Sequence, residues 1–220
     1  MEITYIAHSC FKIKTKNQTI VIDPYDPQTT GYKLPKLSAD ILLISHDHAD
    51  HNFKENVTDV GLLVEGAGEY EKDDTYIYGI KTYHDDKKGA ERGSNTLYLI
   101  ETEGFSLLHL GDLGHELEKE TLENIPQIDV LFIPVGGKYT ITAATAAKVI
   151  SSLEPSFVIP MHYQTKQVTT LSKELAPLDT FLDEMGSDTN GSLEEHDSLK
   201  LTKRSELPND TEVYVLKPIF

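Results

Sequence analysis

Short apolar runs separated by polar segments dominate the first half of the chain. These runs are rich in Ile, Val, Leu, Tyr and Thr, a composition typical of β-strands. We therefore predict strands over residues 2–7, 10–14, 19–22, 40–44, 61–64, 75–83 and 96–101. Three further apolar runs of strand length lie in the second half, at residues 105–110, 129–133 and 157–161.

Helical patterns are concentrated in the second half. Residues 115–124 predict a short charged helix, and residues 142–153 predict an Ala-rich helix that a neighbouring element can approach closely. Apolar residues continue at helical spacing over residues 171–185, followed by Gly186 as a plausible C-cap. Pro177 interrupts this stretch and is expected to break or kink it.

The C-terminal segment predicts irregular structure followed by a closing hairpin. Residues 187–196 are polar and loop-like, whereas residues 198–202 and 211–216 have strand patterns joined by a turn sequence. Earlier in the chain, the strand-like segment 40–44 recurs at 129–133. This repeat fits two similar half-domains, or simply two buried strands of similar composition.

The polar loop after residues 40–44 is dense in metal-ligating side chains, with three histidines and two aspartates in seven residues. Residues two apart in an extended segment point to the same side, so His46 and His48 can bind one ion. Asp50 and His51 can then turn toward a second ion. Imidazole and carboxylate ligands without thiolate favour zinc, with manganese, iron or nickel as alternatives.

Three other strand-like runs also end in a potential ligand, namely His84, Asp112 and His162. Ligand sites of open α/β sheets lie at the carboxyl ends of strands. One edge would thus collect five histidines and two aspartates, enough for two ions about 3.5–4 Å apart. The alternative is a polar loop whose histidines cap a helix, but a cap needs only one or two polar side chains.

Such a site predicts hydrolytic chemistry. Two cations lower the pKa of a shared water from 15.7 toward ~7, which supplies a metal-bridged hydroxide as nucleophile. The cations also polarise the carbonyl or phosphoryl oxygen of the substrate. Asp50 is the candidate that orients the nucleophile and passes its proton to the leaving group. Asp23, just after a strand, is either a brace for a ligand or a turn marker before proline.

The motif HxHxDH, the later lone histidine, the Gly-Asp pair and the final histidine resemble the metallo-β-lactamase superfamily. Five segments more closely resemble its ascorbate-6-phosphate lactonase-like (UlaG-like) branch, at residues 7–11, 21–24, 111–115, 133–140 and 160–163. The resemblance implies a four-layer αββα sandwich, of the α/β (α+β) class, with a dinuclear site along one edge. It also implies a first ion on His46, His48 and His84, a second on Asp50, His51 and His162, and Asp112 as a catalytic ligand between them.

Composition narrows the class of protein. The 220 residues suit one domain, and we expect a single domain over residues 1–220. A net charge of −16 disfavours nucleic acid as a partner, because such binding depends on Lys and Arg. No apolar run approaches the ~20 residues that span a bilayer, and no signal peptide pattern is present, so we expect a cytoplasmic protein without membrane contact. A homo-oligomer is compatible with the sequence.

The remaining histidines and the lone cysteine are interpreted separately. His109 lies in an apolar strand and is expected to be a satisfied core histidine, whereas His196 is expected to be solvated. His8 and His115 flank family-like segments and could bind a ligand or substrate by hydrogen bonds, but neither is assigned as a metal ligand. Cys10 is expected to be a small buried hydrophobe.

The loop at residues 85–95 carries three cations in an otherwise acidic chain. Arg92 is the candidate substrate-binding residue, since its planar guanidinium suits a phosphate or carboxylate; a solvated turn is the alternative. The favoured function is hydrolysis of a small, anionic ester, lactone or phosphoester. The alternatives are a nucleic-acid phosphodiesterase and a non-hydrolytic metal-binding or redox protein. The di-iron redox branch resembles this pattern but carries a glutamate where this chain has His48.

Overall fold

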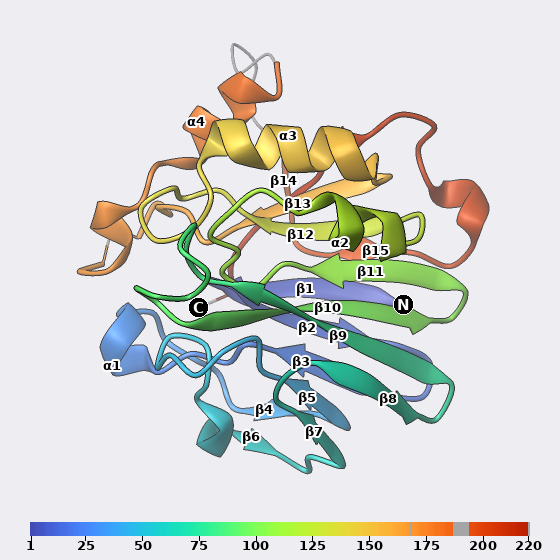
Figure 1. Cartoon of the computed structure of the whole chain (residues 1–220). Coiled ribbons are helices and arrows are strands. Elements are labelled where there is room, and N and C mark those ends of the chain that lie inside the picture. The colour runs from blue at the N-terminus through green and yellow to red at the C-terminus, as the bar shows by residue number, and fades with distance from the viewer. Residues whose placement is uncertain (168, 187–193, 220) are drawn as a thin grey trace.

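Two β-sheets packed face to face form the centre of the molecule (Figure 1). The computed structural model describes residues 1–167, 169–186 and 194–219. The first sheet has six strands in the order β15 (Leu199–Lys200), β1 (Glu2–Ala7), β2 (Cys10–Lys14), β3 (Thr19–Ile22), β5 (Ile41–Leu43) and β7 (Leu62–Val64). Strands β15 to β3 pair antiparallel, whereas β3, β5 and β7 pair parallel.

The second sheet has seven strands. Their order is β16 (Glu212–Val213), β13 (Phe157–Met161), β12 (Val130–Pro134), β11 (Phe105–His109), β10 (Ser94–Thr102), β9 (Thr75–Tyr83) and β8 (Gly68–Lys72). Strands β8 to β11 pair antiparallel, and β11, β12, β13 and β16 pair parallel. The ten strands predicted within residues 2–161 are present, and β8 is an additional strand that was not predicted.

Apolar side chains of the six-stranded sheet point alternately to its two faces, and both faces are buried. In β3, Ile20 and Ile22 join the large core between the sheets, and Val21 joins a smaller core on the opposite face. Such alternation follows from the two-residue side-chain period of a strand. The smaller core, which also contains Tyr25 and Tyr32, needs its own covering layer.

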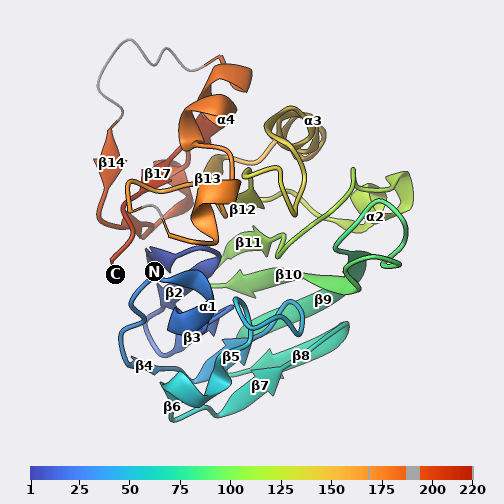
Figure 2. The ribbon, with the colours of Figure 1, turned by 90° about the vertical axis from the view of Figure 1, so that its left-hand side faces the viewer.

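The two outer layers differ in regularity. Helices α3 (Ala143–Leu153) and α4 (Leu178–Glu184) lie over the seven-stranded sheet, with α2 (Lys119–Asn124) beside them (Figures 1 and 2). The opposite side carries the one-turn helix α1 (Pro27–Thr30) and the small sheet of β4 (Leu37–Ser38) and β6 (Val57–Thr58), with the 3-10 turn Lys54–Asn56 between β5 and β6. The predicted four-layer metallo-β-lactamase fold is confirmed, although its second outer layer is mostly irregular.

The helix boundaries depend on local caps. Helix α3 begins where predicted, since the Thr142 side chain accepts a hydrogen bond from the Thr145 amide. Pro177 does break the predicted 171–185 helix, leaving a short 3-10 turn before it and α4 after it, and Gly186 adopts a left-handed conformation. Helix α2 starts only at Lys119, four residues later than predicted. In the described part of the chain, no helix is long and apolar enough to cross a membrane.

The predicted C-terminal hairpin is wrong. Strand β15 pairs with β1, and β16 pairs with β13, while β17 (Val215–Leu216) pairs with β14 (Glu195–His196). The tail strands therefore extend both large sheets instead of pairing with each other, because the edge strands β1 and β13 offer unpaired backbone groups. Strand β14 also replaces the end of the loop predicted at 187–196, of which residues 187–193 lie outside the described part.

Candidate metal centre

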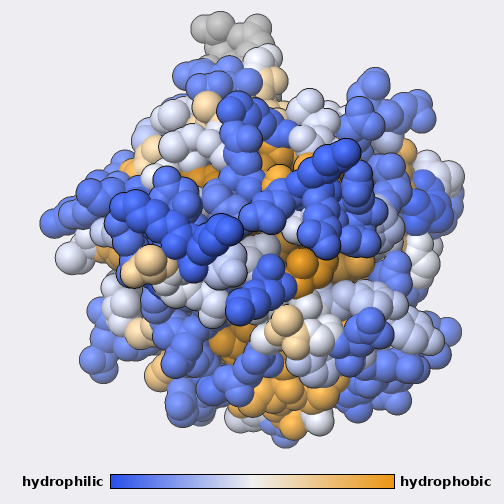
Figure 3. All heavy atoms as spheres, in the orientation of Figure 1, coloured by the Kyte–Doolittle hydropathy of each residue, from blue (hydrophilic) through white to orange (hydrophobic). Residues whose placement is uncertain are grey.

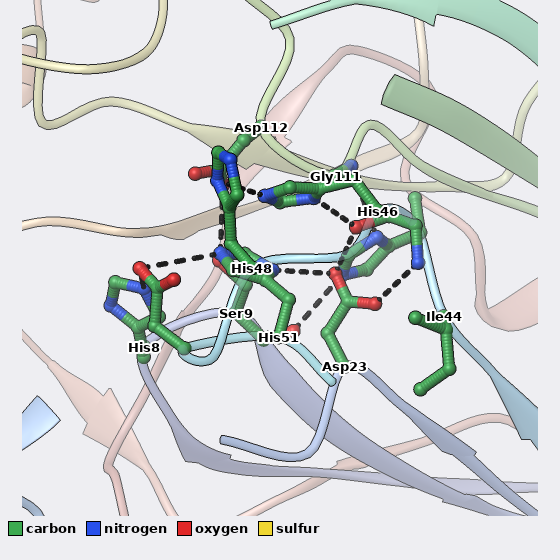
Figure 4. A network of polar contacts seen from close by, with 12 residues as sticks. His8, Ser9, Asp23, Ile44, His46, His48, His51, Gly111 and Asp112 are labelled. Atoms are coloured by element: carbon green, nitrogen blue, oxygen red, sulfur yellow. Dashed lines mark hydrogen bonds and ion pairs between the residues drawn. The ribbon is translucent and has the colours of Figure 1, made fainter. Parts of the chain in front are cut away.

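Six strands end at the same edge of the molecule and each delivers a polar residue to one cluster. Figure 4 labels four of these residues, His8, Asp23, His46 and Asp112. These residues are His8 after β1, Asp23 after β3, His46 after β5, His84 after β9, Asp112 after β11 and His162 after β13. The loop after β5 adds His48, Asp50 and His51. Every ligand position predicted from the sequence thus lies in this cluster.

The first group of possible metal ligands consists of His46, His48 and His84. One ring nitrogen from each lies within 4.8 Å of the others. His46 Nε2 and His48 Nδ1 are 3.1 Å apart, as two nitrogens aimed at a shared point would be. His46 and His84 are buried and His48 is exposed. Burial lowers the pKa of His46 well below its ordinary value, which favours the neutral imidazole that a cation requires.

The second group contains Asp50, His51 and His162, joined by His8. Their ligand atoms also lie within 4.8 Å of one another. The rings of His51 and His162 stack with centroids 6.1 Å apart. His8 was not assigned as a metal ligand; its Nε2 lies 3.2 Å from Asp50 Oδ2, and burial lowers its pKa to about 4. From the sequence, His8 was expected to bind a ligand or substrate by a hydrogen bond because it lies in a family-like segment, and its contact with Asp50 agrees with that interpretation.

Asp112 lies between the two groups. Its Oδ2 is 3.3 Å from His84 Nε2 and 3.2 Å from His162 Nε2, and its Oδ1 is 3.3 Å from His51 Nε2. Burial alone would raise the pKa of this carboxyl, but His162 and His51 hold it well below its ordinary range. In return, Asp112 and Asp23 raise the pKa of His51 well above its ordinary value, against the effect of burial.

The donor atoms fit a bound cation. His51 Nε2 and Asp112 Oδ1 are fully buried, and neither has a hydrogen-bond partner among the described residues. An unsatisfied buried polar atom is costly, so atoms of this kind call for a ligand. Imidazole nitrogens and carboxylate oxygens without any thiolate are a donor set suited to zinc and similar divalent ions. The residues present therefore fit divalent metal ions.

Asp23 orients two of these histidines. Its carboxylate accepts hydrogen bonds from the Ser45 amide at 2.8 Å, the Ser45 hydroxyl at 2.6 Å and His51 Nδ1 at 2.8 Å. The Ser45 hydroxyl has given its one proton to Asp23, so at 2.9 Å it can only accept from His46 Nδ1. In their neutral forms both imidazoles therefore carry their proton on Nδ1, which leaves Nε2 free for a cation. This agrees with the predicted bracing role of Asp23.

A tight turn positions Asp112. Gly111 has φ 52°, and a Cβ there would lie 2.3 Å from Asn95 Oδ1, so only glycine fits. Asn95 Oδ1 accepts the Asp112 amide at 3.0 Å, and His109 Nδ1 accepts the Gly111 amide at 3.1 Å. His109 is fully buried, as predicted for a core histidine, and its Nε2 donates to the Ser9 carbonyl at 3.0 Å.

The other side chains interpreted from sequence lie outside the cluster. His115 Nε2 accepts the Tyr83 amide at 3.3 Å, so it supports the backbone just before His84. His196 is not simply solvated, because its ring stacks on Tyr214 with centroids 4.1 Å apart. Cys10 is fully buried, as predicted.

The loop that carries Arg92 is held by one carboxylate. Asp85 accepts four backbone amides, from Lys87, Gly89, Glu91 and Arg92, at 2.8–3.0 Å. The Arg92 guanidinium lies 5.8 Å from the centre of the Tyr139 ring and 4.0 Å from a Glu91 carboxylate oxygen. Tyr139 belongs to the loop after β12, so Arg92 links two loops that follow strands of the seven-stranded sheet.

One hollow on the surface lies away from the metal cluster. A groove of about 700 Å³ lies between α2 and the outer faces of β8 to β10. Its lining includes the apolar or aromatic residues Tyr78, Ile80 and Leu99 and the acidic residues Glu69 and Glu101. Figure 3 shows a mostly hydrophilic face on which apolar patches are exposed. None of the clustered histidines or aspartates lines this groove.

Comparison with known proteins supports these observations. A family model described as a beta-lactamase superfamily domain matches residues 2–162. A UPF0173 metal-dependent hydrolase from Lysinibacillus sphaericus is 29% identical over 195 residues, covering 75% of this chain and 86% of the relative.

Solved structures are similar along nearly the whole chain. A Thermotoga maritima protein, described as a candidate zinc-dependent hydrolase of the metallo-β-lactamase superfamily, matches with a TM-score of 0.74 and 34% identity, covering 98% of this chain and 97% of that one. A metallo hydrolase from Ignicoccus hospitalis shares the fold at 20% identity and a TM-score of 0.66, covering 91% and 99% of the two chains. With its two packed sheets and the His and Asp cluster at their edge, this chain belongs to the metallo-β-lactamase superfamily.

Proposed function

We propose that this protein is a metal-dependent hydrolase that binds two divalent ions, with zinc as the favoured metal. The observation that carries this proposal is Asp112, whose two oxygens lie within 3.3 Å of His84, His51 and His162. A carboxylate in contact with both ligand groups is suited to bridge two ions. The UPF0173 relative and the Thermotoga protein, both described as hydrolases, support the same class of reaction.

We assign the ligands by group. His46, His48 and His84 would hold one ion, Asp50, His51 and His162 the other, and Asp112 would contact both. Bound there, the ions would lower the pKa of a shared water and polarise the oxygen of the scissile carbonyl or phosphoryl group. Because no serine or cysteine nucleophile is needed, the buried Cys10 has no part in this chemistry.

Two carboxylates have different roles in this proposal. The Asp50 side chain is 18% exposed, whereas that of Asp112 is 2% exposed. Asp50 can therefore meet substrate and water, orient the attacking water and hand its proton to the leaving group. Asp112 is enclosed by histidines and serves as a ligand.

The substrate is proposed to be a small anionic ester, lactone or phosphoester. The segments that resemble the ascorbate-6-phosphate lactonase-like branch favour a substrate of this kind. Arg92 supports it, since a guanidinium held between Tyr139 and Glu91 on a backbone fixed by Asp85 offers a positioned donor for an anionic group.

Metal analysis combined with turnover tests the proposal. Purified protein is expected to carry close to two divalent ions per chain and to hydrolyse at least one member of a panel of anionic esters, lactones and phosphoesters, with phosphodiesters included. Chelation should abolish turnover and zinc should restore it. Asp112→Ala should lose both metal and turnover, whereas His196→Ala, which alters a ring stacked on Tyr214, should keep both. A protein that stays inert and binds no zinc, manganese or iron would refute the proposal.

A further inference from the structure

We infer that His8 is a positioning residue for Asp50, and that it prepares this carboxylate for the second metal ion. The inference rests on the proposed function, because it assumes that Asp50 is a ligand. His8 follows β1, at the far end of the sequence from His162, yet both lie in the same half of the cluster. No family resemblance assigned His8 to the metal site.

Among the described residues, the side chain of His8 has one hydrogen-bond partner, Asp50. Its Nε2 lies 3.2 Å from Asp50 Oδ2, and its ring lies 4.2 Å from the ring of His162. An ionised carboxylate can only accept hydrogen bonds, so Nε2 of His8 must donate. Because the imidazole is only 1% exposed, the surrounding side chains hold its ring in place. The donor is thus held rigidly beside Asp50.

Asp50 depends on this contact. In the described part of the chain, His8 is the one residue within hydrogen-bond distance of the Asp50 carboxylate, and His51 Nε2 is farther away at 3.9 Å. Asp50 also lies in an irregular loop and is more exposed than Asp112, the other aspartate ligand. Without His8 its side chain would be free to rotate away from His51 and His162, and the second ion would lose a prearranged ligand.

The backbone of His8 has a separate function. It adopts φ 58°, and its carbonyl accepts the Tyr5 hydroxyl and the His162 amide, both at 2.8 Å. His162 itself has φ 55°. These contacts do not involve the imidazole, so a change of the side chain can leave the link between the β1–β2 turn and His162 intact. Side-chain and backbone roles can therefore be separated by choice of substitution.

Two variants make this separation. His8→Asn tolerates a positive φ, since asparagine adopts the left-handed region more readily than most residues, but its amide is too short to reach Asp50. His8→Gln places an amide donor near the position of Nε2. Metal-free forms of both variants and of the unaltered protein would be titrated with zinc against a chromophoric chelator, and cobalt spectra would report the ligand environment.

We expect His8→Asn to lower the affinity for the second ion by ~10–100-fold, while the first ion stays bound. This is the usual effect of removing an outer hydrogen bond to a metal ligand. His8→Gln should restore most of the affinity and the cobalt spectrum of the unaltered protein. If His8→Asn binds the second ion with the same affinity as the unaltered protein, the inference is overturned. Failure of His8→Gln to restore binding would also overturn it and would indicate direct ligation by the imidazole. If the unaltered protein binds fewer than two ions, the proposed dinuclear site is refuted, and the inference that His8 prepares Asp50 for a second ion is refuted with it.

Discussion

Asp23 Oδ2 accepts a hydrogen bond from His51 Nδ1 at 2.8 Å, and both side chains are fully inaccessible to solvent. The same carboxylate holds Ser45, which in turn contacts His46 Nδ1. One buried aspartate outside the ligand set thus determines the protonated nitrogen of a histidine in each ligand group.

Asp23→Asn should therefore weaken metal binding without removing a ligand. The asparagine amide group would present a donor where His51 or Ser45 now finds an acceptor, which favours the wrong imidazole tautomer. We expect metal affinity to fall by ~10–100-fold, measured by zinc titration of the metal-free protein.

A matched control for Asp23 is Asp129→Asn. Asp129 is equally buried and binds Arg204 through two contacts at 2.8 Å, but it lies outside the cluster. This variant should lose stability and keep its metal. If the two variants have the same metal affinity, Asp23 does not act through tautomers.

Asp50→Asn and Asp112→Ala should give different defects. Removing the proton-handling carboxylate at Asp50 should lower kcat by ~10²-fold or more while the first ion stays bound. Asp112→Ala should lower metal content as well, because Asp112 contacts both ligand groups. Elemental analysis and steady-state kinetics on the same samples distinguish the two defects. Unchanged turnover in Asp50→Asn would show that Asp50 has no part in the mechanism.

Arg92→Ala should affect anionic substrates selectively. A charge-assisted hydrogen bond contributes roughly 1.5–3 kcal/mol, so kcat/KM for an anionic substrate should fall by ~10-fold or more. A neutral ester should be nearly unaffected. Lys87→Ala is the control, since Lys87 lies in the same loop and pairs with Glu91. Equal losses on charged and neutral substrates would show that Arg92 only supports the loop.

Asp85→Asn should destabilise the protein in a pH-dependent way. Burial would raise the pKa of Asp85, but the amides of Arg92, Glu91, Lys87 and Gly89 lower it overall. A carboxylate with a lowered pKa in the folded state stabilises the protein above its unfolded pKa of ~3.9 and loses this effect as pH falls toward the folded value. The stability difference between the unaltered protein and Asp85→Asn should thus be full at pH 5–7 and shrink below pH ~4.

Urea unfolding across this pH range measures the effect of Asp85. In Asp85→Asn, one pair of backbone amides faces a donor instead of an oxygen, so the variant should unfold at a lower urea concentration at neutral pH. A stability difference that stays constant down to pH 3 would contradict the assigned hydrogen bonds.

The sequence by itself determined the elements and the type of chemistry. Strand and helix patterns are local, because a two- or 3.6-residue period is visible without knowing any distant partner. Ligand types are also local, so the dense His and Asp loop after β5 and the ligands that follow β9, β11 and β13 are visible in the sequence. Because each follows a strand, their meeting at one sheet edge could be predicted as well. Pro177 ended a helix for a reason confined to its own backbone.

Tertiary structure decided how these elements pair and which outer residues support the ligands. The tail strands β15 and β16 join opposite sheets, since strand pairing depends on which edge is open and not on distance along the chain. Asp23 reaches His51 across 28 positions and His8 reaches Asp50 across 42. No local pattern records such contacts, because they exist only once strands from different parts of the chain end at one edge.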